Sequence, residues 1–317
     1  MQKKVEIYIL AGFLGSGKST LLKNLLIEEK EKGRKVAVLM NELGEYSVDS
    51  GIIGTDIALR ELLNGCICCT MKDEVEIQLL MLYQQEQPDV IYIEATGVAH
   101  PVEILDACFS PVIAPHVEVK SIISLVDSKR WMDRSRLNNQ LQKLLEEQIR
   151  FGDQILLNKA DLLSLEEQDR IQTEIVEINP RARQYMTTFT DVPLKELRIS
   201  RDEIEISGQE KLHVHQHLHI QTMTYQFQTE ISKSAFEKWL NALPPSIFRV
   251  KGFVRFKGDS MTHLVQYSYG VPYMYGQPIH FPKNLVMIGG DLNKEEMKKG
   301  LAKLEGTAEG IQILQKV

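Results

Sequence analysis

The segment from Gly12 to Ser19, with the sequence GFLGSGKS, restricts the fold of this 317-residue chain more than any other feature. It fills every position of the phosphate-loop pattern G-x-x-x-x-G-K-[ST], with an apolar run before it and a helix-like stretch after it. Its glycines let backbone N–H groups curl around a phosphate, and the following helix presents its positive end there. Lys18 would place a positive charge on the β- and γ-phosphates, and the Ser19 hydroxyl could ligate Mg²⁺. The pattern predicts a nucleotide site made of Gly12, Gly15, Ser16, Gly17, Lys18, Ser19 and Thr20.

Short apolar runs alternate with helix-like stretches over residues 1–190. This order is typical of a mostly parallel sheet covered by helices on both faces. Pro101 and the Ser164–Glu167 pair are helix-start signals, and Gly33 is expected to end the first helix. The expected strands begin near Val5, Lys35, Asp89, Ser121 and Gln154. We therefore predict the α/β class, with a phosphate-loop GTPase domain in residues 1–190.

A different pattern follows this domain. Residues 191–217 are polar, contain Pro193 and Gly208, and are expected to form a linker with a histidine-rich end. In residues 218–317 the β-like and helix-like stretches follow an order close to β-α-β-β-α-β. This order predicts a second, smaller α+β domain of the ferredoxin-like type.

The composition argues against several classes of protein. A net charge of -6 disfavours a general nucleic-acid-binding protein, and no apolar run is long enough to span a bilayer. We interpret the apolar run at the N-terminus as a first strand and not as a secretion signal, which predicts a cytoplasmic protein. In that reducing compartment the four cysteines are expected to be thiols or metal ligands, not disulfides.

The motif Asn158-Lys159-Ala160-Asp161 follows a predicted strand and has the N-K-x-D pattern that selects guanine in phosphate-loop GTPases. The Asp161 carboxylate can accept hydrogen bonds from guanine N1–H and from the 2-amino group, whereas adenine offers neither donor. An aspartate that simply starts a helix is the alternative. We predict that Asn158, Lys159 and Asp161 select GTP.

Carboxylates follow two other predicted strands. Glu94 ends the run VIYIE and could hold Mg²⁺ directly or through water, and the Gly97 N–H could sense the γ-phosphate. The carboxylates after the preceding strand, at the same expected edge of the sheet, are Glu42, Glu45 and Asp49. Some of these carboxylates are expected to orient the attacking water, and simple solvation is the alternative. The predicted catalytic residues are Lys18, Glu42, Glu94 and Gly97.

Three of the four cysteines, Cys66, Cys68 and Cys69, lie within four positions. Thiolates suit Zn²⁺, and three sulfurs could supply most of a tetrahedral site. In an extended segment Cys66 and Cys68 point to one side and Cys69 to the other, so a site that uses all three requires a bend. A site with fewer thiolates, completed by Glu45 or another loop carboxylate, fits the sequence equally well. Buried apolar cysteines and a redox pair are the remaining interpretations.

Taken in order, the phosphate loop, NELGE, CICC, EATG and NKAD resemble the motifs of CobW-type metal-chaperone GTPases, relatives of the GTPases that mature urease and hydrogenase. The resemblance covers the whole chain and includes FRVKGFVRF, residues 248–256, in a CobW-type C-terminal domain. It implies a cytosolic GTPase that binds a transition metal, most often Zn²⁺ and in some members Co²⁺ or Fe²⁺, and delivers it to a client metalloprotein. The sequence departs from the family at three positions. Leu43 replaces the usual Phe, Ala95 replaces the usual Ser, and Met40 stands where some members have an acid.

The histidines at the domain junction alternate with other residues, so in a strand they would line one face. Many members of the resembled family carry such a stretch, and we interpret it as a weak site that collects metal for the cysteines. An edge strand with a polar face is the alternative. These histidines are His213, His215, His217 and His219. Cys108 and the isolated histidines are expected to be structural.

The predicted metal segment lies between the magnesium-side loops, which predicts that GTP and metal affect each other's binding. In this hypothesis one nucleotide state holds the ion, and hydrolysis or client docking releases it. A small-molecule kinase and a metal-sensing GTPase without transfer are the other functions considered, and NKAD and the cysteine cluster count against the kinase. By analogy with related GTPases we expect a nucleotide-dependent homodimer. No arginine finger can be assigned from the sequence, which fits slow GTP turnover.

Overall fold

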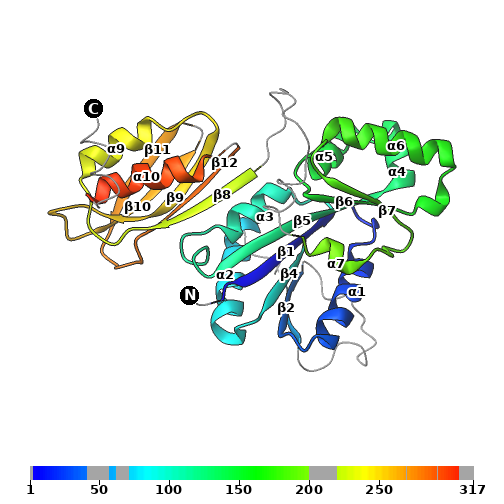
Figure 1. Ribbon diagram of the computed structural model, residues 1–317, viewed down its shortest axis with the longest axis horizontal. Helices are drawn as coiled ribbons and strands as arrows, with labels where there is room; N and C mark the ends of the chain where they lie inside the picture. The colour runs from blue at the N-terminus through cyan, green and yellow to red at the C-terminus, as the bar shows by residue number, and fades with distance from the viewer. Residues whose placement is uncertain are drawn as a thin grey trace. The chain divides into compact units, whose positions relative to one another are not determined.

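The computed structural model of the chain describes residues 3–40, 57–61, 71–199, 220–268, 270–290 and 292–306. The chain divides into two compact units (Figure 1). The first comprises Met1–Cys108 and His116–His217, and the second comprises Phe109–Pro115 and Leu218–Val317. Each unit is a separate structural body with its own sheet.

The described residues of the first unit form a seven-stranded sheet in the order β3-β2-β4-β1-β5-β6-β7. Every neighbouring pair is parallel, which confirms the predicted α/β class. The strands are β1 (Val5–Gly12), β2 (Val36–Met40), β3 (Ile57–Glu61), β4 (Val90–Glu94), β5 (Val117–Asp127), β6 (Gln154–Asn158) and β7 (Arg183–Met186). The sequence did not predict β3 and β7. Both are short, both lie at the edges of the sheet, and neither has a continuous apolar run.

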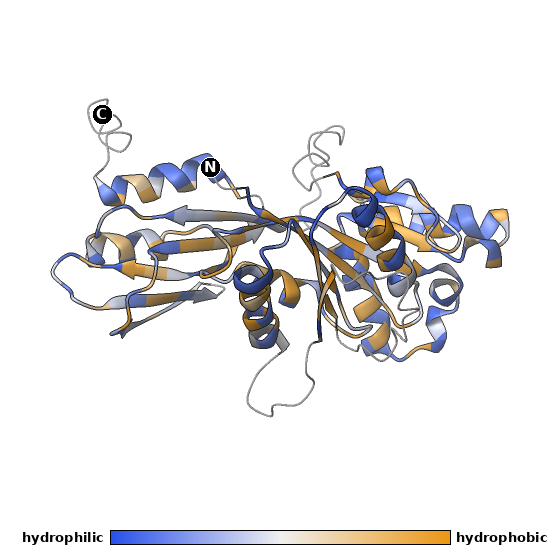
Figure 2. Cartoon of the chain, turned by 90° about the horizontal axis from the view of Figure 1, so that it is seen from below, coloured by the Kyte–Doolittle hydropathy of each residue, from blue (hydrophilic) through white to orange (hydrophobic). Residues whose placement is uncertain are grey.

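Helices cover both faces of this sheet, and neighbouring residues of a strand supply the two cores. Leu156 packs into a cluster with α1, whereas Ile155 and Leu157 pack into a cluster with α4, α5 and α6. This division explains why the strands are apolar on both sides. The helices are α1 (Lys18–Glu31), α2 (Met71–Glu86), α3 (Pro101–Cys108), α4 (Ser128–Met132), α5 (Asn139–Arg150), α6 (Leu165–Ile178) and α7 (Leu194–Leu197). Figure 2 shows the same pattern, with mostly hydrophobic strands in the larger sheet and helices that carry hydrophilic residues along part of their surface.

The helix ends follow the predicted signals. Ser164 and Glu167 form the capping box that begins α6, and α3 begins at Pro101. Gly33, with a φ of 64°, follows the end of α1. Local sequence therefore sets these boundaries correctly.

The described part of the second unit forms a five-stranded sheet in the order β11-β10-β9-β12-β8, and its neighbouring strands are antiparallel. The helices α9 and α10 contribute Phe236, Leu240, Met297 and Leu301 to its core. The α+β class of this unit is as predicted, but β11 is an additional strand that contains Pro272 and Gly276. The elements are β8 (Ile220–Gln226), α9 (Lys233–Asn241), β9 (Ile247–Arg255), β10 (Thr262–Ser268), β11 (Val271–Gln277), β12 (Asn284–Gly290) and α10 (Lys294–Glu305).

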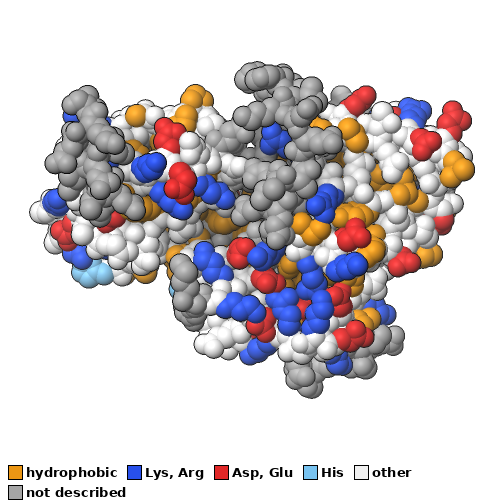
Figure 3. All heavy atoms as spheres, in the orientation of Figure 1, with side chains coloured by type: hydrophobic (Ala, Val, Ile, Leu, Met, Phe, Trp, Pro, Cys, Tyr) orange, Lys and Arg blue, Asp and Glu red, His pale blue; other side chains and the backbone are white. Residues whose placement is uncertain are grey.

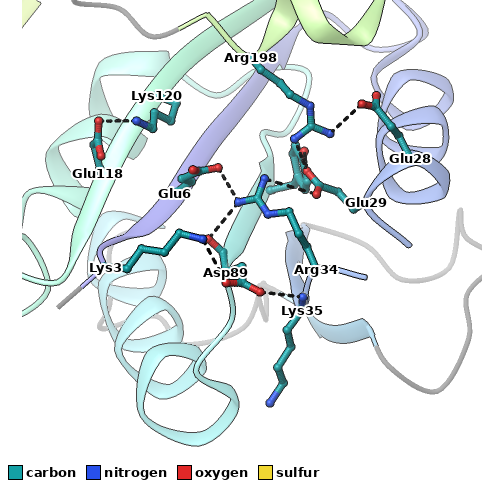
Figure 4. Close-up of polar contacts among 11 residues, drawn as sticks. Lys3, Glu6, Glu28, Glu29, Arg34, Lys35, Asp89, Glu118, Lys120 and Arg198 are labelled. Carbon is teal, nitrogen blue, oxygen red and sulfur yellow. Dashed lines mark hydrogen bonds and ion pairs between the residues drawn. The ribbon is translucent and has the colours of Figure 1, made fainter. Parts of the chain in front are cut away.

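A buried ionic cluster centres on Glu29 of α1, whose side chain is fully buried. Its carboxylate accepts hydrogen bonds from Tyr92 Oη at 2.6 Å and Arg198 Nη1 at 2.7 Å, and lies 3.4 Å from Arg34 Nη1 (Figure 4). Burial, together with the Glu29 carboxylate, raises the pKa of the Tyr92 hydroxyl well above its usual value, so Tyr92 remains a donor. The cluster ties α1, β4 and the residue after α7 together.

The surface around the described elements carries charges of both signs. On the face shown in Figure 3, basic and acidic side chains are interspersed rather than sorted into separate fields. None of the described helices combines the length and hydrophobicity that crossing a membrane requires.

We expect Glu29→Gln to lower the free energy of unfolding of the first unit by about 3 kcal/mol, because it leaves two partly buried guanidinium groups without a shared carboxylate. Urea denaturation measures this change. The matched control is Glu31→Gln, which changes an exposed glutamate of the same helix. An effect of Glu29→Gln as small as that of the control would contradict a stabilising role for the cluster.

Candidate functional site

The phosphate loop leaves the central strand β1 at Gly12 and enters α1 at Lys18. Gly12 has a φ of 136°, and a Cβ atom there would lie 2.3 Å from the Leu125 carbonyl oxygen. Gly17 has a φ of 110°, and its Cβ would lie 2.4 Å from Asn158 Nδ2. Backbone conformation and space therefore both require glycine at these two positions. The loop has the tight course that phosphate binding needs.

Lys18 is buried, and its ammonium group lies against the loop. Nζ donates to the carbonyl oxygens of Gly12 at 2.9 Å and Phe13 at 3.2 Å. The hydroxyl of Ser16 is also buried and has no hydrogen-bond partner among the described residues. A buried donor of this kind is costly unless a ligand satisfies it. Both side chains fit a loop that holds phosphate oxygens.

The two predicted magnesium ligands lie together. Ser19 Oγ, in the first turn of α1, donates to Glu94 Oε1 at 2.8 Å. Glu94 is the last residue of β4 and pairs in register with Leu10 of β1. A hydroxyl and a carboxylate are oxygen donors of the kind that Mg²⁺ prefers. The donor set therefore fits the ion.

Gly97 lies directly against the phosphate loop. A Cβ atom on Gly97 would come within 2.6 Å of the Leu14 nitrogen. The segment is held from α5, where Gln148 Nε2 donates to the Gly97 and Ala99 carbonyl oxygens at 3.2 and 3.4 Å. Gln148 is 3% exposed. No local sequence pattern marks Gln148, because its partners lie about 50 positions away in the chain.

Asn158 connects the guanine motif to the phosphate loop. Its Nδ2 donates to the Ser16 carbonyl oxygen at 2.8 Å, and its Oδ1 accepts from the Thr190 backbone N–H at 3.1 Å. Lys159 has a φ of 62°, and its Nζ lies 2.6 Å from Asp127 Oδ2. Asp161 is exposed in the 3₁₀ helix Ala160–Leu162. The three predicted residues thus lie at the carboxyl end of β6, with Asn158 and Lys159 held in place and Asp161 open to solvent.

Sequence reasoning missed the loop after β7. Phe189 and Thr190 both adopt left-handed backbone conformations, with φ of 51° and 59°, although neither is glycine. The loop is bonded to the guanine motif, because the Ala160 N–H donates to the Thr187 carbonyl oxygen at 3.1 Å. Phe189 is 78% exposed beside this motif. Strained non-glycine residues cluster at functional sites, but no sequence signal marks them.

Several predicted ligands lie outside the described residues. They are Glu42, Glu45, Asp49, Cys66, Cys68, Cys69, His213, His215, His217 and His219. Over the ranges that the structure does describe, no three His, Cys, Asp or Glu side chains are grouped to hold a metal. The flanking strands are described, and Met40 at the end of β2 pairs with Glu94 on one side and Glu61 on the other. Met40, the residue before the predicted acids, therefore lies beside Glu94, and Glu61, which precedes the predicted cysteines, lies one strand further out.

Cys108 and three of the histidines expected to be structural have defined surroundings. Cys108 is fully buried, and burial raises the pKa of its thiol. His100 Nε2 lies 3.2 Å from Glu147 Oε2, and His116 Nδ1 lies 3.0 Å from Tyr83 Oη. His263 Nε2 lies 2.8 Å from Asp259 Oδ2.

Comparison with known families identifies both parts of the chain. The family model described as CobW/HypB/UreG, nucleotide-binding domain, matches residues 6–186. The model described as cobalamin synthesis protein cobW C-terminal domain matches residues 220–305. The first match alone covers more than half of the chain.

Individual proteins agree with these matches. Zinc chaperone YjiA of Escherichia coli is 30% identical over 324 residues, with 95% of this chain and 98% of that protein covered. Zinc-regulated GTPase metalloprotein activator 1 of Dictyostelium discoideum is 30% identical over 230 residues, and the match spans 48% of that protein, about half of its length. The crystal structure of Zn(II)-bound YjiA GTPase from E. coli has a TM-score of 0.50 at 25% identity and covers 95% of this chain and 99% of that chain.

We expect Gly97→Ala to weaken nucleotide binding by about tenfold or more, because the added methyl group would displace Leu14 of the phosphate loop. Calorimetry with GTP and GDP measures the effect. Gly33→Ala is the matched control, since Gly33 has a positive φ but no described residue within 4 Å of where its Cβ would stand. The control should lower stability by about 1 kcal/mol and leave affinity unchanged. Normal affinity in Gly97→Ala would contradict the close approach of the two loops.

Proposed function

The chain belongs to the CobW/HypB/UreG family of P-loop GTPases, and from that premise we propose that it is a metallochaperone. In this proposal GTP binding and hydrolysis control the binding of Zn²⁺ and its delivery to a client metalloprotein. The observation that carries the proposal is the contact between Ser19 and Glu94 at 2.8 Å, beside Lys18 and next to the end of β2. It supports a site for the triphosphate and Mg²⁺ next to the end of β2, one strand away from β3, which precedes the predicted cysteines.

The described geometry supports the proposed GTP site. The loop from Gly12 to Thr20 surrounds the phosphates, Asn158 and Lys159 position the guanine side, and Asp161 accepts from guanine N1–H and the 2-amino group. Hydrolysis joins a water oxygen to the γ-phosphorus and breaks the bond to the β–γ bridging oxygen. The electron pair stays on the β-phosphate, and the water proton passes to solvent. The Gly97 N–H is assigned to the γ-phosphate side, and Glu42 is assigned to orienting the water.

Mg²⁺ fits this site because Ser19 and Glu94 supply oxygen donors. When bound, the ion neutralises negative charge on the β- and γ-phosphates. Lys18, held over the loop by two carbonyl oxygens, contributes further positive charge. The chain's own residues thus place cations where the phosphate charge develops.

Zn²⁺ is the proposed cargo. The relatives named as zinc chaperones and the Zn(II)-bound neighbour support zinc over Co²⁺ or Fe²⁺. Cys66, Cys68 and Cys69 are the proposed ligands, completed by Glu45 if fewer thiolates bind. The histidines from His213 to His219 are a secondary site that collects the ion.

In this proposal the nucleotide controls the cargo because β2, which precedes the acids, ends beside Glu94, and β3, which precedes the cysteines, ends one strand further out. Linkage then requires that GTP change zinc affinity and that zinc change GTP affinity by the same factor. We assign the protein to a reducing, cytoplasmic environment, where the thiols stay available, and expect it to form a homodimer in the GTP state.

Replacing Cys66, Cys68 and Cys69 together with serine is expected to reduce the zinc content of protein purified without chelators to background, because the soft ligands are gone. Elemental analysis measures the content. Cys108→Ala, which removes the buried fourth thiol, should keep the metal. Zinc retained by the triple variant would exclude the proposed ligands.

The same preparations test control and delivery. Zinc affinity should differ between the GTP, GDP and nucleotide-free forms, and equal affinities would exclude coupling. Zinc should then move to an apo-client protein. A coupled protein that never transfers the ion would instead be a metal-sensing GTPase.

Asp161→Asn is expected to weaken GTP binding by about tenfold or more and to strengthen binding of xanthosine triphosphate, because the amide matches the xanthine donor and acceptor pattern. Competition between the two nucleotides measures the change. Asp169→Asn, an exposed aspartate of α6, is the control. Unchanged preference for GTP in Asp161→Asn would remove this residue from the guanine site.

A further inference from the structure

Arg130 of α4 lies against the phosphate loop, although it is 116 positions away from it in the chain. Its Nη1 donates to the Leu14 carbonyl oxygen at 2.9 Å, and its guanidinium carbon lies 4.9 Å from the centre of the Phe13 ring. Both partners belong to the loop that holds the candidate phosphate site. The guanidinium is therefore already at the rim of that site.

The base of the Arg130 side chain is fixed by Asp127. Asp127 Oδ1 accepts from the Arg130 backbone N–H at 3.0 Å, and the other oxygen lies 2.6 Å from Lys159 Nζ. Asp127 ends β5 and pairs in register with Asn158. One carboxylate thus positions both Arg130 and the lysine of the guanine motif.

The charge of Arg130 is not neutralised by a carboxylate among the described residues. Its partners are a neutral carbonyl oxygen and an aromatic ring. Arg134, four positions later, differs in this respect, because its Nη2 lies 2.9 Å from Glu174 Oε2. A guanidinium held by one neutral acceptor exchanges that acceptor for an anion readily, since charge-assisted hydrogen bonds to phosphate are stronger.

The surroundings leave room for this exchange. Leu14 is 62% exposed, and a Cβ atom placed on Gly15 would meet no atom of the described residues within 4 Å. Among the described residues, none therefore packs against the loop at Gly15.

We propose that Arg130, from the same chain, contacts the γ-phosphate of GTP and stabilises the charge that develops during hydrolysis. This inference rests on the proposed GTPase function. On nucleotide binding, the Arg130 N–H groups move from the Leu14 carbonyl oxygen to oxygens of the β- and γ-phosphates. As the water oxygen bonds to phosphorus and the bond to the bridging oxygen breaks, negative charge grows on the β-phosphate, and the guanidinium stabilises it. The same side chain contributes less to GDP, which lacks the γ-phosphate.

The test compares the full-length chain with Arg130→Ala, Arg130→Lys and the control Arg136→Ala, which removes an exposed arginine of the adjacent 3₁₀ helix. GTP turnover gives kcat and KM. Calorimetry gives the affinity for GDP alone and for GDP with aluminium fluoride, a mimic of the phosphoryl group in transfer. Thermal melting shows whether each variant is folded.

We expect Arg130→Ala to lower kcat by about 10²-fold or more and to weaken GDP with aluminium fluoride by a similar factor, while GDP affinity changes by less than about twofold. Arg130→Lys should recover part of the loss because it keeps the charge, and Arg136→Ala should match the unaltered chain. Equal weakening of GDP with and without aluminium fluoride would overturn the proposal and leave Arg130 as a residue that shapes the loop. An unchanged kcat would also overturn it.

The two hypotheses can fail separately. If the unaltered chain binds GTP without hydrolysing it, the proposed function fails. The aluminium fluoride comparison still decides the role of Arg130, because it requires no turnover. Selective loss of the fluoride complex in Arg130→Ala supports the assignment, and a loss shared with GDP alone refutes it.

Discussion

The nucleotide site depends on the hydrogen bonds that the buried side chain of Asn158 makes. Its amide group joins the phosphate loop, through the Ser16 carbonyl oxygen, to the loop after β7, through the Thr190 N–H. Gly17 is glycine because the Asn158 side chain occupies the space where a Cβ would stand. Three loops from distant parts of the chain therefore share one side chain, and each can be positioned only when the other two are present.

The opposite end of the same sheet is organised by charge. Glu6 lies at the amino end of β1, and Arg34 lies two residues before β2, so the ionic cluster around Glu29 lies away from the carboxyl edge that holds the phosphate loop. This separation lets the carboxyl edge keep unpaired donors such as the Ser16 hydroxyl, while stability comes from elsewhere in the unit. Functional sites commonly retain such unsatisfied groups at a cost that the rest of the fold offsets.

The sequence predicted the parts of the molecule that local chemistry determines. The phosphate loop, the apolar strands β1, β4 and β6, and the capped start of α6 each carry their signal within a few residues. The edge strands β3 and β7 and the additional strand β11 lacked that signal, because pairing with a neighbour rather than an apolar run defines them. Gln148, Phe189 and Arg130 were missed for a related reason. Their roles arise from partners that are distant in the chain or from strained backbone, neither of which composition or spacing reveals.

The strand order has a consequence for synthesis on the ribosome. The phosphate loop is encoded within the first 19 residues, yet β1 lies between β4 and β5, and the wall beside Gly17 comes from residue 158. A nascent chain therefore carries a central strand with no neighbour until β4 has emerged, and a phosphate loop without its contact at Gly17 until residue 158 has emerged. Such long-range pairing folds slowly and exposes apolar surface in the meantime. The first unit would then be able to bind a nucleotide only after its distant parts have folded together.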